Sequence, residues 1–254
     1  MGHIHKILSG CLRKVQFPHG EKMLKSNEQK TKTEHCSFGY CFVKRAFDVI
    51  VSVIGLIFTV FFSVLVAVGN NYHGDNCCII FSQQRIGRNG RPFTLYKFRT
   101  MYPESEELLG GLLKNTVYCS EWEKNQKLIN DPRVTRNGRF LRSYGLDELP
   151  QFFNILKGEM SFIGPRPLVE GELEAHKGDA LYYYSVKPGL IGWWVCNRTP
   201  QLSYAERLGL EYYYIENQCF TLDIKILLMT VFKRKFFNDE EFRKDDKKTD
   251  AHFR

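Results

Sequence analysis

The segment DPRVTRNGRFLRSYGLDELPQFFNILKGEMSFIGPRP, Asp131 to Pro167, carries the strongest signal in this chain. Two adjacent carboxylates, Asp147 and Glu148, come just before Pro150, and proline is favoured in the first turn of a helix. The apolar QFFNIL run that follows stops at Gly158, and glycine is typical of a helix end. The pattern therefore predicts a helix that begins at the acidic pair.

Arginines are dense around this acidic pair. A helix start offers free N–H groups and a positive dipole end, which favour a carboxylate and also a phosphate. The planar guanidinium group binds phosphate oxygens through two parallel hydrogen bonds. Together these features indicate an anionic substrate brought to a nucleophile, and the arginines concerned are Arg133, Arg136, Arg139, Arg142 and Arg166. The alternative is structural: the acids cap a helix and the arginines form a solvated face.

Ordered blocks across the chain resemble the bacterial sugar transferases of the monotopic phosphoglycosyl transferase family. The segment above contains the family pattern D-x-R-x-T-x-x-G-x-x-L-R, then L-D-E-L-P-Q, N-x-L-K-G-x-M-S and G-P-R-P. Upstream, Gln83–Met101 matches a Q-x-R-x-G and K-F-R-T-M block, and downstream KPGLIGWWVCN from Lys187 matches P-G-x-x-G-W. The resemblance covers roughly residues 44 to 232.

The resemblance implies transfer of a phosphosugar from a nucleoside diphosphate sugar, expected to be a UDP-sugar, to polyprenyl (undecaprenyl) phosphate. This would be the first step in assembling a polysaccharide or glycoconjugate. Asp147 would be the nucleophile, forming an aspartyl-phosphosugar and releasing UMP, and Glu148 would act beside it. Because all the reactants are anionic, cations are required: Mg²⁺ held by Asp147 and Glu148, and the phosphate- or nucleotide-binding candidates Lys97, Arg99, Arg133, Arg142, Pro165, Arg166 and Pro167.

One block departs from the family pattern. Where the family usually reads G-W-A-Q-V-N-G, this chain has Trp194 for alanine and Val195 for glutamine. The change either alters sugar recognition or packs another ring.

Val49 to Gly69 carries no charge and, at ~1.5 Å per residue, is long enough for a ~30 Å hydrocarbon core. Basic residues flank it on both sides, so neither flank is typical of an external loop. The family's helix is re-entrant, broken at a Ser-Pro pair that here reads Ser63-Val64. We therefore expect a re-entrant helix with both ends in the cytoplasm of a bacterium and the catalytic domain on the cytoplasmic face of its inner membrane; a spanning helix is the alternative.

Lys44, Arg45 and Asp48 match a K-R-x-x-D block at the membrane entrance. The resemblance gives these residues a lipid-linked phosphate to bind, whereas the simpler interpretation is a cationic anchor to lipid headgroups. An unpaired carboxylate is costly so near an apolar segment. We therefore expect Asp48 to pair with one of these bases or with a helix N-terminus.

Charge and cysteine content limit the other functions. The net charge is +8, and the first 45 residues supply +6 of it from nine Lys or Arg and three Glu. The rest is nearly balanced and lacks a nucleic-acid-binding motif, so we expect no nucleic-acid partner. The eight cysteines show no zinc spacing or disulfide framework. A catalytically silent binder of lipid phosphate or anionic membrane stays open, as does a homodimer.

The remaining sequence predicts an α+β monotopic protein. Cys77–Phe81 and Phe93–Phe98 are β-rich, and Asn89-Gly90 between them is typical of a tight turn, so a β-hairpin is expected. Two amphipathic helices, near Tyr204–Glu216 and Leu222–Lys235, would suit the core or a membrane surface. The expected division is a basic extension (1–43), a membrane helix (44–70), a mainly helical catalytic domain (71–235) and a charged tail (236–254).

Overall fold

A computed structural model describes residues 38–73, 78–125, 128, 130–197 and 202–231. Its contacts divide the chain into two compact units: the larger comprises His35–Met101 and Thr135–Arg254, and the smaller includes Tyr102–Val134. The smaller unit contains α4 (Ser105–Leu112) and α5 (Thr116–Asn125). The expected basic extension up to residue 37 and the charged tail lie outside the described residues.

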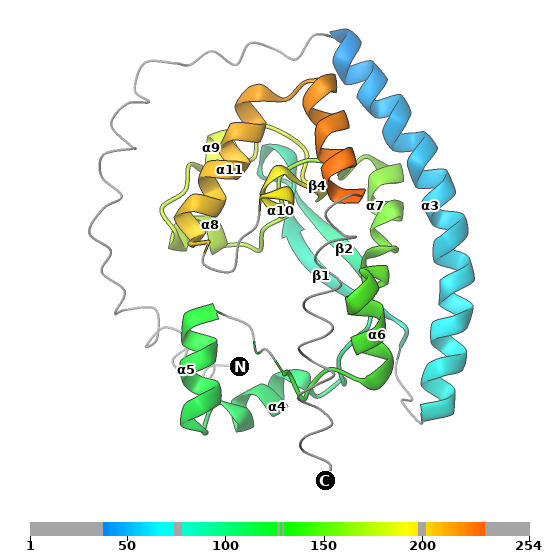
Figure 1. The fold of residues 1–254 in the computed structure, drawn as a ribbon, viewed down its shortest axis with the longest axis vertical. Coiled ribbons are helices and arrows are strands. Elements are labelled where there is room, and N and C mark those ends of the chain that lie inside the picture. Colours follow the sequence, from blue (N-terminus) through cyan, green and yellow to red (C-terminus); the bar gives the residue numbers. More distant parts are fainter. Residues whose placement is uncertain (1–37, 74–77, 126–127, 129, 198–201, 232–254) are drawn as a thin grey trace. The chain divides into compact units, whose positions relative to one another are not determined.

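The larger unit mixes helices with short strands, which confirms the α+β class (Figure 1). Helical residues 220–231 follow the last labelled helix. In chain order the labelled elements are α3 (Phe38–His73), β1 (Ile80–Ile86), the 3-10 turn η1 (Arg88–Gly90), β2 (Pro92–Phe98), α6 (Arg136–Tyr144), the 3-10 turn η2 (Leu146–Glu148), α7 (Gln151–Lys157), β3 (Ser161–Ile163), α8 (Glu172–Ala175), α9 (Ala180–Tyr183), β4 (Gly189–Ile191), α10 (Trp193–Cys196) and α11 (Tyr204–Asn217).

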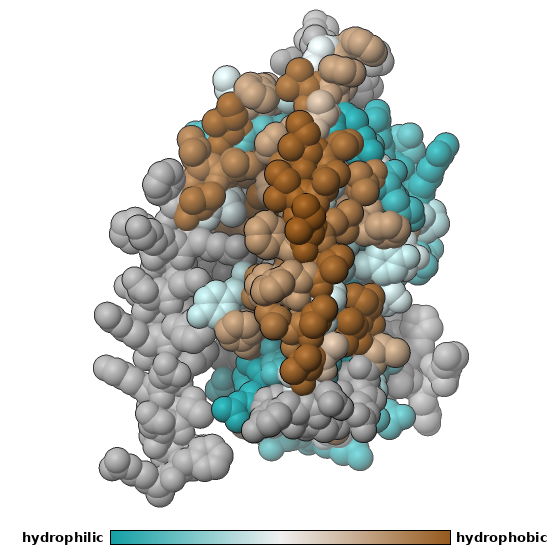
Figure 2. Space-filling view, turned by 90° about the vertical axis from the view of Figure 1, so that its right-hand side faces the viewer, coloured by the Kyte–Doolittle hydropathy of each residue, from teal (hydrophilic) through white to brown (hydrophobic). Residues whose placement is uncertain are grey.

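Helix α3 is continuous over 36 residues and runs beside α7 and α6 along one side of the larger unit (Figure 1). Among the described residues, it alone is long and apolar enough to cross a bilayer. Its outward face is a continuous apolar band (Figure 2). Its buried face is small or polar at most positions, unlike the usual surface helix of a soluble protein: Asp48, Ser52, Gly55, Thr59, Val66 and Asn70.

The predicted hairpin is confirmed. Strands β1 and β2 pair antiparallel from Ile80 opposite Phe98 to Ile86 opposite Pro92, so the first strand lies further along the chain than expected. Asn89 and Gly90 adopt the left-handed conformation, with φ of 59° and 72°. Asparagine and glycine tolerate this conformation, which explains why the turn forms here.

Local sequence fixes the helices around the acidic pair. The Thr135 side chain accepts a hydrogen bond from the Gly138 N–H and caps α6, which ends at Gly145 in the left-handed conformation. The acidic pair then occupies η2, and α7 begins only at Gln151. The predicted helix start at the pair is therefore wrong: a separate 3-10 turn intervenes. The predicted end is confirmed, since Gly158 caps α7 with φ 84°.

The core that supports this region lies between the hairpin and α7. Phe93 and Leu95 of β2 pack with Phe152 and Ile155 of α7 and with Met160. Next to it, β3 and β4 form a short parallel pair. These contacts hold η2, the hairpin and the β4–α10 segment as neighbours around one pocket.

Candidate active site

Asp147 and Glu148 lie on η2, which joins α6 to α7 and packs against β2. The Lys97 ammonium donates a hydrogen bond to Glu148 Oε1 at 2.9 Å. Leu149, directly after the pair, has its carbonyl bonded by the Thr59 hydroxyl of α3 at 3.0 Å. The turn is thus held from the strand on one side and from the long apolar helix on the other.

The charge state of Asp147 follows from its surroundings. Burial raises its pKa above the ordinary value, and the neighbouring Glu148 carboxylate adds to the rise. Lys97 and Arg142 oppose this rise because they stabilise the ionised carboxylate. Arg142 is itself oriented by a hydrogen bond of 2.9 Å from Nε to Thr100 Oγ1. A poorly solvated carboxylate beside two cations is suited, in its ionised form, to nucleophilic attack on phosphorus.

A pocket opens beside this pair. Its lining comes from the hairpin, the η2–α7 region, the Gly-Pro-Arg-Pro turn and the β4–α10 segment. The residues are Arg85, Leu95, Lys97, Glu148, Gln151, Gly164, Arg166, Pro167, Gly189, Leu190, Gly192, Trp194 and Val195. Three cationic side chains and a single carboxylate therefore face one cavity. The electrostatic balance favours an anionic ligand.

The Gly164-Pro165-Arg166-Pro167 turn is clamped in place. The Arg166 N–H donates to Glu211 Oε1 at 3.0 Å, and the Arg166 carbonyl accepts from the Tyr183 hydroxyl at 3.0 Å. A Cβ on Gly189 would lie only 2.0 Å from the Gly164 nitrogen, so β4 passes too closely for any side chain there. The turn is therefore held by its neighbours as well as by its two prolines.

Glu211, which holds the turn, is completely buried. Burial raises its pKa to about 7, although the hydrogen bond from Arg166 and the charges of Arg207 and Arg166 lower it. Its second oxygen, Oε2, lacks a hydrogen-bond partner among the described residues. Sequence reasoning missed this residue because a glutamate in an amphipathic helix is usually exposed.

Arg85, Arg166 and Arg207 form a cluster at the pocket, of which Arg85 and Arg166 belong to its lining. Arg85 donates to the Pro167 carbonyl at 3.1 Å and lies 3.8 Å from Glu172, and burial followed by repulsion from Arg166 lowers its pKa to about 10. Within the described residues, the Nε atoms of Arg85, Arg166 and Arg207 have no hydrogen-bond partner. Guanidinium groups with unused N–H donors are suited to binding phosphate oxygens. The sequence placed Arg166 here, but Arg85 was seen only as part of a matching block.

Residues 39–236 match the family of bacterial sugar transferases. The chain belongs to this family. It is 42% identical over 190 residues to the undecaprenyl-phosphate galactose phosphotransferase of Salmonella typhimurium, which covers 74% of this chain and 40% of that protein. It is 40% identical over 190 residues to the exopolysaccharide production protein ExoY of Rhizobium meliloti, covering 74% and 83%. It is 35% identical over 211 residues to the undecaprenyl-phosphate glucose phosphotransferase of Komagataeibacter xylinus, covering 78% and 37%.

The family match confirms the resemblance drawn from the sequence blocks. The chain spans about two fifths of the length of the Salmonella relative and about four fifths of ExoY. The sugar transferase part is therefore common to proteins of different lengths.

Four of the predicted phosphate- or nucleotide-binding residues lie outside the pocket lining: Arg99, Arg133, Arg142 and Pro165. The Arg99 Nε donates to the Cys78 carbonyl at 3.0 Å, and its guanidinium lies 5.8 Å from the Phe81 ring centroid. Arg133 belongs to the smaller unit, where its Nε and Nη2 donate to the two carboxylate oxygens of Asp131 at 2.8 and 2.6 Å. For Arg99 and Arg133, the structure thus gives the guanidinium a partner within the protein.

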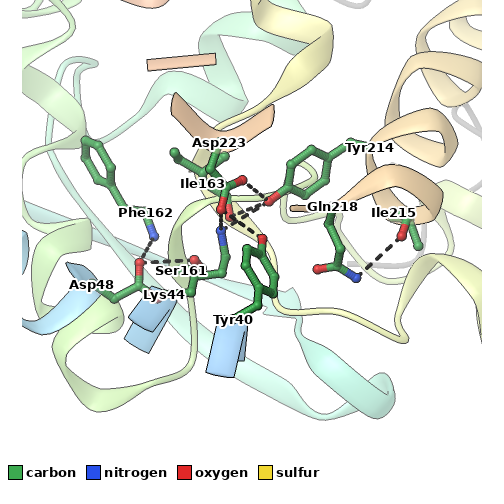
Figure 3. Close-up of polar contacts among 10 residues, drawn as sticks. All are labelled: Tyr40, Lys44, Asp48, Ser161, Phe162, Ile163, Tyr214, Ile215, Gln218 and Asp223. Carbon is green, nitrogen blue, oxygen red and sulfur yellow. Dashed lines mark hydrogen bonds and ion pairs between the residues drawn. The ribbon is translucent and has the colours of Figure 1, made fainter. Parts of the chain in front are cut away.

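The predicted lipid-phosphate ligands at the start of α3 also have protein partners (Figure 3). The Lys44 ammonium lies 2.7 Å from Asp223 Oδ2, and Asp223 also accepts hydrogen bonds from the Tyr40 and Tyr214 hydroxyls at 2.8 Å each. The Arg45 guanidinium donates to two carbonyls in the last turn of α7, at 2.7 and 2.8 Å. These contacts fasten α3 to the rest of the larger unit.

Asp48 is paired differently from the prediction. Its Oδ1 accepts from the Phe162 N–H at 2.8 Å and the Ser161 hydroxyl at 3.1 Å, both on β3 (Figure 3). The expectation of a bond to a neighbouring base or to a helix N-terminus was wrong. An edge N–H of a short strand satisfies the buried carboxylate instead.

The acidic pair fits a magnesium ion. Mg²⁺ binds through one or two carboxylates and completes its shell with water and substrate phosphates. Asp147 and Glu148 offer two such carboxylates, and Glu148 lines the pocket together with Arg85, Lys97 and Arg166. Within the described residues, the structure contains no group of three or more His, Cys, Asp or Glu side chains that could hold a metal ion.

Proposed function

We propose that this chain transfers a phosphosugar from a UDP-sugar to undecaprenyl phosphate, the first step of assembling a bacterial polysaccharide or glycoconjugate. The observation that carries the proposal is the pocket in which Glu148, the neighbour of Asp147 on η2, lies in one lining with Lys97, Arg85 and Arg166. The names of the relatives support it, since two of them are undecaprenyl-phosphate sugar phosphotransferases.

The reaction would proceed in two displacements. An ionised oxygen of Asp147 attacks the sugar-linked phosphorus, and a new O–P bond forms. The bond between this phosphorus and the oxygen bridging it to the second phosphate breaks, and UMP leaves with the electron pair. A phosphate oxygen of the lipid then attacks the same phosphorus, and the aspartyl O–P bond breaks. This step restores the carboxylate, so that Asp147 ends as it began.

The cations would act at separate points of this path. Lys97 and Arg142 are the cations that lower the pKa of Asp147. They would stabilise the ionised nucleophile and the negative charge on the reacting phosphate. Arg85 and Arg166 would hold the phosphate of the departing nucleotide. Asp147 and Glu148 would hold Mg²⁺, which when bound neutralises diphosphate charge.

Membrane attachment through α3 fits this chemistry because the acceptor is a lipid. The buried face of α3 is covered by the larger unit from Asp48, at β3, to Asn70, which accepts a hydrogen bond from Asn137 of α6 at 3.1 Å. At ~1.5 Å per residue this covered length is about 33 Å, the thickness of a hydrocarbon core. A spanning α3 would thus draw the polar larger unit into the bilayer.

We infer instead that α3 enters the cytoplasmic leaflet and leaves it on the same side. Proline is missing at the family's break position, but three hydroxyls bond carbonyls one turn earlier on α3, an arrangement that bends helices. They belong to Ser52, Thr59 and Ser63. The exposed apolar face of residues 220–231, comprising Phe220, Ile224, Leu228 and Val231, would rest on the same membrane surface.

The direct test is UMP release by the detergent-solubilised protein incubated with a panel of UDP-sugars, undecaprenyl phosphate and Mg²⁺. We expect release with one or a few donors and its loss in Asp147→Asn, which keeps the shape of the side chain but not its nucleophilic charge. Omitting the lipid should leave the wild type heavier by one phosphosugar, mapped to Asp147 by intact-protein and peptide mass spectrometry. Lipid binding without UMP release from any donor would instead indicate a silent binder.

A further inference from the structure

Trp194 stands at one end of a column of stacked side chains. The Arg207 guanidinium lies 4.8 Å from the Trp194 ring centroid and 5.0 Å from the Tyr204 ring centroid. Tyr204 in turn stacks on His176, with centroids 3.5 Å apart and planes 15° apart. A guanidinium held between two aromatic faces orients both rings. The Trp194 side chain is therefore held firmly from one side.

Trp194 is also a lining residue of the pocket. Trp194 lines the cavity together with Lys97, Glu148, Arg85 and Arg166, whereas Arg207 does not. The Arg207 guanidinium that contacts the ring therefore belongs to a residue outside the pocket lining, whereas Trp194 forms part of the wall.

Two groups of charged residues lie in and around this pocket: Lys97 bonds Glu148, the neighbour of Asp147, at 2.9 Å, and Arg85 and Arg207 lie 3.8 and 3.9 Å from Glu172. The charges that act on Asp147 are Glu148, Lys97 and Arg142. The charges that act on Arg85 are Arg166, Glu172 and Arg207, and Arg207 is the residue on which Trp194 stacks. A donor whose reacting phosphorus sits at Asp147 would therefore extend, through its second phosphate at Arg85 and Arg166, toward Trp194.

We propose that Trp194 is a stacking platform for the nucleobase of the donor, a specificity residue that rests on the proposed function. The sugar is attached directly to the reacting phosphorus and so belongs at the Asp147 end. The base is separated from that phosphorus by the second phosphate and the ribose and so reaches the Trp194 end. Aromatic side chains bind bases through their flat faces. The family pattern has alanine at this position, so this chain would hold the base more tightly than the pattern residue allows.

Binding of UDP, which lacks the sugar, tests the platform without turnover. We expect calorimetry on the purified full-length protein in detergent to show roughly ten- to hundred-fold weaker UDP binding in Trp194→Ala. Trp194→Leu, which keeps apolar bulk over Arg207, should lose a similar factor, whereas Trp194→Phe should stay within about threefold of the wild type. The matched control is Trp193→Ala, because Trp193 stacks on Tyr213 and is not part of the pocket lining.

The alternatives give different results. An equal loss of UDP affinity in Trp193→Ala and Trp194→Ala would mean that α10 had unfolded in both variants. That result would overturn the platform. If folded Trp194→Ala binds UDP as tightly as the wild type and binds only the UDP-sugar more weakly, Trp194 contacts the sugar and the platform for the base is wrong. Inorganic diphosphate should bind the wild type and Trp194→Ala equally, and a loss there would assign the effect to the phosphate site.

The platform and the proposed function can fail separately. If the wild type binds UDP through Trp194 but releases no UMP from any UDP-sugar, the transferase proposal fails and the platform stands. If UMP is released normally and folded Trp194→Ala has an unchanged Michaelis constant for the donor, the platform fails and the transferase proposal stands.

Discussion

Burial and a neighbouring cation shift the pKa of the Asp147 carboxyl in opposite directions. Burial and Glu148 raise its pKa, whereas Lys97 lowers it. Since the nucleophile must be ionised, kcat/KM for UMP release should rise with pH through the pKa of Asp147. Replacing Lys97 by Met removes the stabilising charge, so the pKa of Asp147 rises further. The acid limb of the profile should move to higher pH.

The measurement is kcat/KM between pH 5 and 9 for the wild type and Lys97→Met. Arg91→Met is the matched control, because it removes one exposed charge from the same hairpin outside the pocket lining. A limb that stays in place in Lys97→Met, or moves to lower pH, would contradict the assignment of the limb to Asp147.

Some residues of the candidate site could be recognised from the sequence and others could not. The acidic pair and Arg166 stand out because each lies in a short, dense pattern. Glu211 does not, since it meets the Arg166 N–H across 45 residues of sequence and lies in an ordinary amphipathic helix. Arg207 is recognisable only once Trp194 and Tyr204 lie on its two faces. Roles that depend on long-range contacts and burial leave no local signal.

Among the elements, α3 depends on close packing at a glycine. A Cβ on Gly55 would lie 2.4 Å from the ring of Phe152 on α7, so the ring would have to move. We expect Gly55→Ala to destabilise the larger unit by about 1–3 kcal/mol, as overpacking of a core usually does. Thermal unfolding in detergent should report a lower midpoint.

Gly209→Ala is the control for this prediction. Gly209 lies inside α11, and a Cβ there has open space within 4 Å. The substitution should stabilise the protein by about 0.5–1 kcal/mol through helix propensity. If both variants shift the midpoint in the same direction, the Gly55–Phe152 contact does not position α3.

Local chemistry predicted several elements correctly. The hairpin follows from β-rich runs around Asn89-Gly90, and the end of α7 follows from Gly158. The start of α7 was misplaced because Pro150 suits a first helical turn but also serves as the cap after a 3-10 turn. The polar inner face of α3 was not foreseen, since apolar content alone does not indicate which side faces protein.

For the whole molecule, the membrane topology follows from the two faces of α3. Its outward face is apolar along its length, and its inner face is covered by the larger unit over about 33 Å. Both ends of the segment carry basic residues, which favour the cytoplasmic side. We therefore expect Cys41, near the start of α3, and Cys78, just after it, to lie on the same side of the membrane. Both side chains are exposed in the structure.

Variants that keep only Cys41 or only Cys78 can test this in spheroplasts treated with a membrane-impermeant maleimide. Neither cysteine should react while the membrane is intact, and both should react after it is permeabilised. The permeabilised sample is the control for reactivity, because a buried thiol would stay unlabelled there as well. Labelling of one cysteine alone in intact spheroplasts would establish a spanning helix. It would also require the contacts of Asp48 and Asn70 with the larger unit to break, since both contacts cannot persist if α3 crosses the bilayer while the larger unit stays in the cytoplasm.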